Sequence, residues 1–189
     1  MVLTEPPLSV GEYLRVEEAS PVKHEYVAGQ IFALAGATKR HNHITVNLVT
    51  CLAAAARGGR CGVYLADVKL RVSEEVLYYP DVMVACGPAG EDPLIEDSPC
   101  LVIEVTSPST EMIDRREKVL AYRQIASLQA YVIVHQGEPR VERHWRDGSD
   151  VWRYDEVAGE GRVALPCPEV ELSLDAIYEG VTASELDRR

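Results

Sequence analysis

The chain has 189 residues, of which 47% are hydrophobic and 26% are charged. This composition is typical of a folded globular protein and argues against a disordered segment or a coiled coil. Thirty acidic residues against 19 lysines and arginines give a formal net charge of −11 at pH 7. Proteins that coat nucleic acid non-specifically normally carry an excess of basic residues, so the charge argues against that class.

The first predicted elements are a helix, a hairpin and a longer helix. The capping-box pattern from Ser9 to Glu12 predicts a short helix over residues 10–18. Two short strands, 23–27 and 30–34, flank a tight turn at Ala28-Gly29. Apolar residues three or four positions apart predict a helix with one buried stripe over residues 42–56.

Strands dominate the rest of the chain. The predicted strands cover residues 60–65, 69–72, 76–79, 81–84, 101–105, 131–134, 141–145, 151–157 and 162–165. Residues 85–99 are expected to form a loop, and 101–105 are almost wholly apolar, as in a central strand covered on both faces. A second capping-box pattern begins at Asp114 and predicts a helix to about residue 125, and a short helix near 174–178 closes the chain.

This order predicts an α/β or α+β domain in which a mixed β-sheet is flanked by helices. No repeat or linker divides the chain, so a single domain over residues 1–189 is expected. No apolar run approaches the roughly 18 residues of a membrane-spanning helix. The first residues, with Glu5 and two prolines, resemble neither a signal peptide nor a basic targeting segment. A cytoplasmic protein without membrane attachment is therefore expected.

The five cysteines are scattered along the chain and never spaced as CxxC. They are Cys51, Cys61, Cys86, Cys100 and Cys167. An odd number without metal-ligand spacing predicts buried free thiols, not a zinc site or a disulfide framework.

Two acidic residues fall within predicted buried strands. Asp81 begins one apolar strand, and Glu104 lies inside the run Leu-Val-Ile-Glu-Val. An ionised carboxylate in apolar surroundings costs several kcal/mol unless it is paired or bound to a cation. Neighbouring strands lie only about 4.8 Å apart, so two such carboxylates can share one ion, and Mg²⁺ suits them. A structural salt bridge from Glu104 to Lys69 or Lys118 explains the pattern about equally well.

Five motifs resemble those of the Uma-two family of restriction-endonuclease-like proteins. They cover residues 25–31, 79–82, 103–110, 114–118 and 122–128, in order, and the similarity extends over residues 9–180. The family in turn resembles the PD-(D/E)XK nucleases. The resemblance implies a restriction-endonuclease-like mixed β-sheet flanked by helices, with acidic residues and a lysine around Mg²⁺.

The resemblance also implies roles for individual residues. Asp81 and Glu104 match the two metal-binding acids, with Mn²⁺ as a substitute for Mg²⁺. The superfamily places its lysine two residues after the second acid, where this chain has Thr106. The Uma-two pattern assigns the amine to Lys118 instead, with Lys69 as its rival. Glu25 is a candidate third carboxylate, although a surface charge pair is the alternative, and Asp67 is a further candidate acid.

Other polar residues carry weaker signals. His41 and His43 do not share a helical face, so they form a poor zinc site, and His41 is more simply explained as a helix-start residue. The basic residues Arg115, Arg116, Lys118 and Arg123 either face a phosphate backbone or form an exposed helix face. No GxxxxGK[ST] motif is present, which excludes a P-loop route to NTP hydrolysis.

Taken together, these features predict a Mg²⁺-dependent endonuclease that hydrolyses DNA phosphodiester bonds. Cutting both strands favours a two-fold homodimer. Two alternatives stay open. One is a catalytically inactive interaction module with the nuclease fold, which the charge and Thr106 favour; the other is a small-molecule phosphodiesterase, which suits the acidity.

Overall fold

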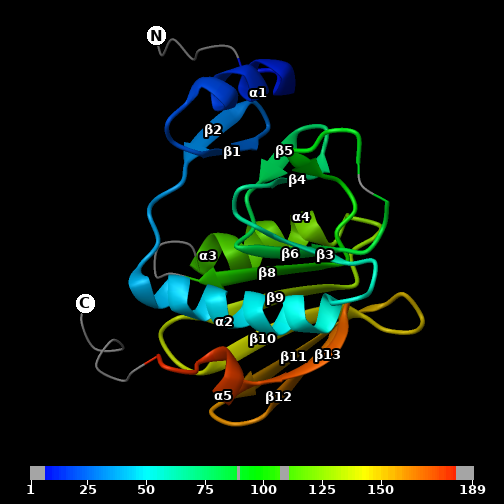
Figure 1. The fold of residues 1–189 in the computed structure, drawn as a ribbon. Helices are drawn as coiled ribbons and strands as arrows, with labels where there is room; N and C mark the ends of the chain where they lie inside the picture. Colours follow the sequence, from blue (N-terminus) through cyan, green and yellow to red (C-terminus); the bar gives the residue numbers. More distant parts are fainter. Residues whose placement is uncertain (1–6, 89, 107–110, 182–189) are drawn as a thin grey trace.

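A six-stranded mixed sheet forms the centre of the computed structural model, which describes residues 7–88, 90–106 and 111–181 (Figure 1). The strands follow the order β11–β10–β9–β8–β6–β3. Their bounds are β3 (Gly62–Leu65), β6 (Val82–Ala85), β8 (Leu101–Thr106), β9 (Ala130–His135), β10 (Arg140–Arg146) and β11 (Trp152–Ala158). The pair β8–β9 is parallel, and the other neighbouring strands run antiparallel.

A second sheet of five strands lies beside the first, in the order β2–β1–β5–β4–β7. Its strands are β1 (His24–Val27), β2 (Gln30–Ala33), β4 (Lys69–Ser73), β5 (Val76–Tyr78) and β7 (Ile95–Glu96). The predicted turn between β1 and β2 is confirmed, because Ala28 and Gly29 have φ values of 48° and 86°, as a type I′ hairpin turn requires. A separate hairpin joins β12 (Arg162–Pro166) to β13 (Glu169–Ser173).

Both faces of the six-stranded sheet are buried at its central strands β6, β8 and β9. The side chains of Leu101, Ile103 and Val105 in β8 pack with α2 (Lys39–Ala56), the hairpin β12–β13 and α5 (Leu174–Ile177). Val102 packs on the opposite face, in the cluster that includes Tyr122. Side chains alternate along a strand, so Glu104 lies on the same face as Val102. This is the face that carries the candidate site.

Helices α1 and α2 begin at side-chain caps. In α1 (Val10–Ala19) the predicted capping box between Ser9 and Glu12 is confirmed. Helix α2 begins a turn earlier than predicted, because the Thr38 side chain accepts a hydrogen bond from the N–H of His41. Its buried stripe places Leu48 and Leu52 in the core.

The segment before β9 contains a helical irregularity. The chain is helical over α3 (Glu111–Ile113), then forms a π-helical turn, η1 (Asp114–Lys118), and continues as α4 (Val119–Tyr122). The predicted capping box at Asp114 is wrong, because the preceding residue is already helical and no side chain caps the turn. The helix also ends before residue 125. A π turn carries one more residue than an α turn and is frequent at functional sites.

The predicted α+β class is confirmed, and the predicted strands agree with the structure to within one or two residues. Two strands were missed. Strand β7 lies inside the expected loop 85–99 and is too short to show any periodicity. Strand β13 has only Val170 and Leu172 as its apolar residues. Among the described residues, no helix combines the length and hydrophobicity needed to cross a bilayer.

The prediction of free cysteine thiols is wrong for four of the five residues. Disulfides join Cys61 to Cys86 and Cys100 to Cys167, and Cys51 belongs to neither. The pairing of β3 with β6 explains the first bond, since it aligns Gly62 with Ala85 and so brings the residues just outside that pair together. Sequence spacing does not reveal contacts of this kind.

Candidate active site

Strand pairing brings Asp81 and Glu104 together. Asp81 immediately precedes β6, and Glu104 lies in β8. These strands are antiparallel with Val82 opposite Ile103, so the next pair along is Asp81 and Glu104. The main-chain N–H of Asp81 donates to Glu104 Oε2 at 3.3 Å, and the N–H of Val105 donates to Asp81 Oδ2 at 2.8 Å. The two acids therefore share one end of the same strand pair.

Lys118 lies among three carboxylates. Its Nζ is 2.9 Å from Glu104 Oε1, 3.2 Å from Glu25 Oε1 and 3.5 Å from Asp114 Oδ1. The lysine side chain is only 8% exposed. The hydroxyl of Tyr122 also donates to Glu104 Oε1, at 2.8 Å. One oxygen of Glu104 is thus held by Lys118 and Tyr122, while the other points toward Asp81.

Glu25 and His41 reach this cluster from other elements. Glu25 comes from β1, and its Oε1 accepts a hydrogen bond from the main-chain N–H of Tyr79 at 3.4 Å. His41 lies in the first turn of α2, with Nε2 3.1 Å from Asp81 Oδ2. The cluster therefore draws on both sheets and two helical segments, although its members are far apart in the sequence.

The cluster has an excess of negative charge. Burial raises the pKa of Glu104 to about 8; Lys118 opposes this shift, and the carboxylates of Asp81, Asp114 and Glu25 add to it. Burial alone would lower the pKa of Lys118, but Glu104, Glu25 and Asp114 outweigh it and raise that pKa well above the ordinary value. Lys118 is therefore a cation at neutral pH, suited to donate hydrogen bonds but not to accept a proton.

His41 shows a similar balance. Burial by itself lowers its pKa, but the hydrogen bond and the charge of Asp81 outweigh burial, so the net shift is upward. His41 contacts Asp81 Oδ2, the same oxygen that accepts the Val105 N–H. These two contacts fix the orientation of the Asp81 carboxylate.

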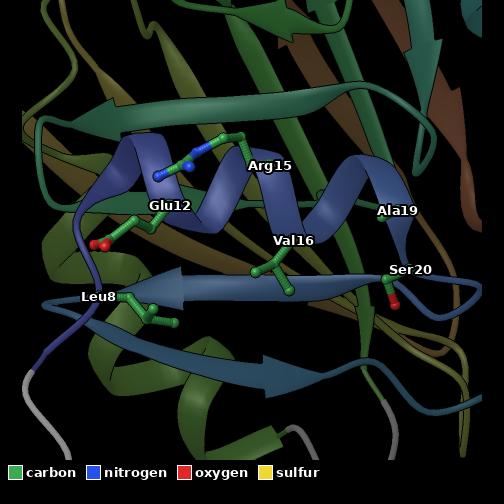
Figure 2. A pocket seen from close by; sticks show the side chains of 6 residues that line it. All are labelled: Leu8, Glu12, Arg15, Val16, Ala19 and Ser20. Atoms are coloured by element: carbon green, nitrogen blue, oxygen red, sulfur yellow. The ribbon is translucent and has the colours of Figure 1, made fainter.

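A pocket of about 700 Å³ opens over the cluster. Its lining includes Glu25, His41, Asp81, Glu104 and Lys118, together with the 34–38 segment between β2 and α2. A second pocket, along α1, has a single acidic residue and no pair of carboxylates among the described residues that line it (Figure 2). Its one acidic side chain, Glu12, is engaged in the capping box with Ser9. The paired carboxylates therefore distinguish the first pocket as the candidate site.

The donor atoms of this site fit a hard divalent cation. Mg²⁺ takes oxygen ligands, commonly one or two carboxylates, and keeps waters in its other positions. Asp81 Oδ1 accepts no hydrogen bond from the described part of the chain, and Glu104 Oε2 accepts only the long one from the Asp81 N–H. Both oxygens are available to a shared ion, and the pocket leaves room for waters.

Residues 10–176 match the model of the Uma2 (Uma-two) family, described as "Putative restriction endonuclease". The chain belongs to the Uma2 family. Two uncharacterized proteins of Synechocystis, slr1290 and sll1609, are each 34% identical to it. The first match covers 93% of this chain and 94% of the relative, and the second covers 85% and 93%.

A solved structure shares the fold of this Uma2 protein. It is the crystal structure of a "putative nuclease" from Anabaena variabilis, with a TM-score of 0.75 and 16% sequence identity. The similarity covers 91% of this chain and 98% of that chain. The restriction-endonuclease-like fold expected from the sequence is thus confirmed.

The structure brings together the four residues expected at the site: Asp81, Glu104, Lys118 and Glu25. Their roles in catalysis stay predictions. Lys69, the rival of Lys118, instead lies over the Tyr79 ring, with Nζ 5.4 Å from its centroid. Asp67 pairs with Lys23, and its side chain is 84% exposed, so it forms a surface charge pair. Thr106 is buried at the end of β8.

The four basic residues of this segment form neither a phosphate-facing row nor an exposed helix face, the two interpretations that the sequence left open. Lys118 is buried, Arg115 pairs with Glu142, and Arg123 lies over Trp152. Of the four basic residues, only Arg116 is exposed. Lys118 lies in the π turn. Arg115 and Arg123 contact residues of β10 and β11, respectively. The helix that carries Lys118 therefore does not present a phosphate-binding row.

Sequence reasoning missed the site contacts of Asp114 and Tyr122. Both lie four positions from Lys118, and residues four apart are neighbours on a helix surface. The pattern Asp-x₃-Lys-x₃-Tyr was a visible signal, but Asp114 was assigned to a cap. His41 was likewise assigned to the helix start, which it does form, and its contact with Asp81 needs the tertiary structure.

Proposed function

We propose that this Uma2 protein is a Mg²⁺-dependent endonuclease that hydrolyses phosphodiester bonds in DNA, with Mn²⁺ as a substitute. The observation that carries the proposal is the pairing of Asp81 with the buried carboxylate of Glu104 beneath a pocket. Membership of a family described as "Putative restriction endonuclease" supports the same reaction class. So does the fold shared with a "putative nuclease".

Asp81 and Glu104 would hold the ion through Asp81 Oδ1 and Glu104 Oε2. Mg²⁺ held there would supply Lewis-acid chemistry, polarising a phosphate and lowering the pKa of a water. Tyr122 and Lys118 hold Glu104 Oε1 and so keep Oε2 aimed at Asp81. His41 and the Val105 N–H do the same for Asp81. Such supporting contacts orient metal ligands.

Lys118 has a second role in this proposal. Because its pKa is raised, it remains charged during the reaction. A fixed cation next to a reacting phosphate stabilises the negative charge that develops in the transition state. Lys118 thus contributes charge and hydrogen bonds, and the proton of the attacking water has to leave to another acceptor, such as solvent or Glu25.

The proposal includes a homodimer, which would place two such sites on the two strands of a duplex.

A small-molecule phosphodiesterase is the second candidate function. One observation favours it: the net charge of −11 repels a long polyanion more than a small substrate.

The test is a cleavage assay on plasmid DNA, single-stranded DNA and a small chromogenic phosphodiester, each with Mg²⁺, Mn²⁺ or EDTA. We expect metal-dependent DNA cleavage that Asp81→Asn and Glu104→Gln reduce by at least about 100-fold, since even residues that only support metal ligands contribute about 10–100-fold. Asp67→Asn is the matched control, because that carboxylate lies on the surface.

Other results of the cleavage assay would lead to different conclusions. Cleavage of the small phosphodiester alone would favour the second candidate. Cleavage that survives EDTA, or equal activity in Asp81→Asn and wild type, would exclude this metal site as the catalyst. Failure to cleave any substrate while Mg²⁺ still binds would indicate the inactive interaction module.

A further inference from the structure

Four cysteines gather at the end of β6 and β8 opposite the carboxylates. Cys86 follows β6, and Cys100 precedes β8. Cys61 precedes β3, and Cys167 lies in the turn between β12 and β13. Cys100 and Cys167 are buried, whereas Cys61 and Cys86 are half-buried. Four separate segments of the chain thus contribute one cysteine each.

The four sulfur atoms form one group. Cys86 Sγ is bonded to Cys61, yet it also lies 3.0 Å from Cys167 Sγ and 3.5 Å from Cys100 Sγ. The sulfur atoms of Cys61, Cys86 and Cys167 all lie within 4.8 Å of one another. Two independent structural disulfides do not need their sulfur atoms in contact, so this convergence calls for its own explanation.

We propose that, in the reduced protein, Cys61, Cys86, Cys100 and Cys167 form a tetrahedral site for a single Zn²⁺ ion. Thiolates are soft ligands, and four of them around one centre select zinc over Mg²⁺ or Ca²⁺. A zinc–sulfur distance of about 2.3 Å places tetrahedral ligands about 3.8 Å apart. Two non-bonded pairs already approach this value, with Cys86 Sγ 3.5 Å from Cys100 Sγ and 3.0 Å from Cys167 Sγ. The bonded pairs Cys61–Cys86 and Cys100–Cys167 would separate to it on reduction. A cluster of several iron atoms would hold the thiolates farther apart.

Reduction of the two disulfides frees all four sulfur ligands. Two equivalents of a dithiol reductant supply four electrons and four protons, which break both disulfides and leave four thiols. Zn²⁺ then binds as the thiols lose their protons to solvent, because the thiolate is the ligand. After loss of zinc and return of protons to the four thiolates, two equivalents of a disulfide oxidant take up four electrons and four protons and restore the two disulfides. The same four residues are therefore linked in either state.

The position of the group suggests what zinc does for the fold. The hairpin β12–β13 forms its own two-stranded sheet, and Cys167 in its turn contacts cysteines at the edge of the central sheet. An ion held by all four residues fastens this hairpin to β3, β6 and β8. Structural zinc sites of this kind contribute directly to folding stability. The half-buried Cys61 and Cys86 provide a route of entry.

The test uses the full-length protein, produced with added zinc and purified under reductant without chelator. We expect one Zn²⁺ per chain by elemental analysis. Replacement by Co²⁺ should give the visible absorption and sulfur-to-cobalt charge-transfer bands of tetrahedral thiolate coordination. Cys100→Ser should lose the ion, and Cys51→Ser, which changes the thiol outside the group, should keep it.

The Co²⁺ spectrum of the wild-type protein decides the question even if Cys100→Ser does not fold. Absence of zinc and of the cobalt bands, while five thiols titrate in the reduced protein, would overturn the proposal. Equal loss of zinc in Cys51→Ser would also overturn it. So would loss of zinc in Asp81→Asn, since that would place the ion at the carboxylates.

Discussion

The strands β6 and β8 carry oxygen donors at one end and sulfur donors at the other. Asp81 and Glu104 meet at the first end, which we call the oxygen end. Cys86 and Cys100 meet at the second, which we call the sulfur end. Antiparallel pairing explains both meetings, because it places residues of two distant segments opposite each other. Proximity alone therefore does not distinguish the two ends.

The surroundings of the two ends differ more than their geometry. The oxygen end holds like charges that repel, and it needs a buried lysine at its centre. The sulfur end lies in the apolar cluster of α2, β6, β8 and the hairpin β12–β13. Donor type and neighbouring charge, not distance, are thus the grounds on which we propose a hard cation at one end and a soft cation at the other.

The largest expected effect comes from Lys118→Met, which would break the charge balance of the oxygen end. It leaves Glu25, Glu104 and Asp114 without their shared cation. Removal of one partner of a buried ion pair costs about 3–5 kcal/mol, so urea unfolding at pH 7 without metal should show a loss of this size. Added Mg²⁺ should restore part of it.

Lys69→Met is the matched control. Lys69 is as buried as Lys118, but its amine lies over the Tyr79 ring. A smaller loss is expected there, with no response to Mg²⁺. Equal losses in the two variants would mean that the carboxylates around Lys118 do not depend on its charge.

A second prediction concerns the independence of the two ends. Cys86→Ser should abolish zinc binding and leave Mg²⁺-dependent cleavage within about twofold of wild type, because changes at well-separated sites are usually additive. Asp81→Asn should do the reverse. Metal analysis and cleavage rates of the two variants and of the double variant check this. A loss of both functions in either single variant would show that the ends are coupled.

The smallest expected effect is a pH dependence of opposite sign in two carboxylates. Glu104 has its pKa raised to about 8, so the folded state binds more protons than the unfolded state above the ordinary glutamate pKa of about 4.3. The free energy of unfolding of the metal-free protein should therefore fall as the pH rises from about 4.3 to about 8. The raised pKa of His41 adds a fall in the same direction. Glu104→Gln should flatten the slope.

Glu142 should give the opposite pH dependence to Glu104, because its pKa is lowered and not raised. Burial raises its pKa, but hydrogen bonds from His135 and Arg115 outweigh burial and lower it to about 2. Its contribution should be complete above a pH of about 4.3 and disappear as the pH falls toward 2. Glu142→Gln should thus be destabilised at pH 7 relative to wild type, and the difference should vanish as the pH falls through about 2. Urea unfolding in EDTA across the pH range measures both slopes, and a Glu104→Gln curve parallel to wild type would refute the first.

The oxygen end was largely predictable from sequence, because a glutamate inside an apolar strand is a local signal. The assignment of Lys118 rested on family resemblance, since no local rule connects a helix residue to β8. Asp114 was misassigned, because a cap and a buried ion pair use the same residue type. The π turn that sets its position has no signature in the sequence.

The sulfur end was not predictable. Its cysteines are joined across 25 and 67 positions of the sequence. Their meeting depends on the register of β3 with β6 and on the packing of a separate hairpin. Neither appears in local periodicity or in metal-ligand spacing, so the pattern indicated isolated thiols.

The central claim, that Asp81 and Glu104 share a metal ion, is tested most directly by thermal melts of wild type and Asp81→Asn with and without Mg²⁺. The ion relieves repulsion between the acids and binds only the folded state, so it should raise the wild-type Tm. The asparagine keeps an oxygen for the Val105 N–H and removes one negative charge. We predict that metal-free Asp81→Asn is at least as stable as wild type and does not respond to Mg²⁺. An Asp81→Asn protein that melts far below wild type, with Mg²⁺ shifting neither protein, would contradict the claim and make the pair a structural salt bridge.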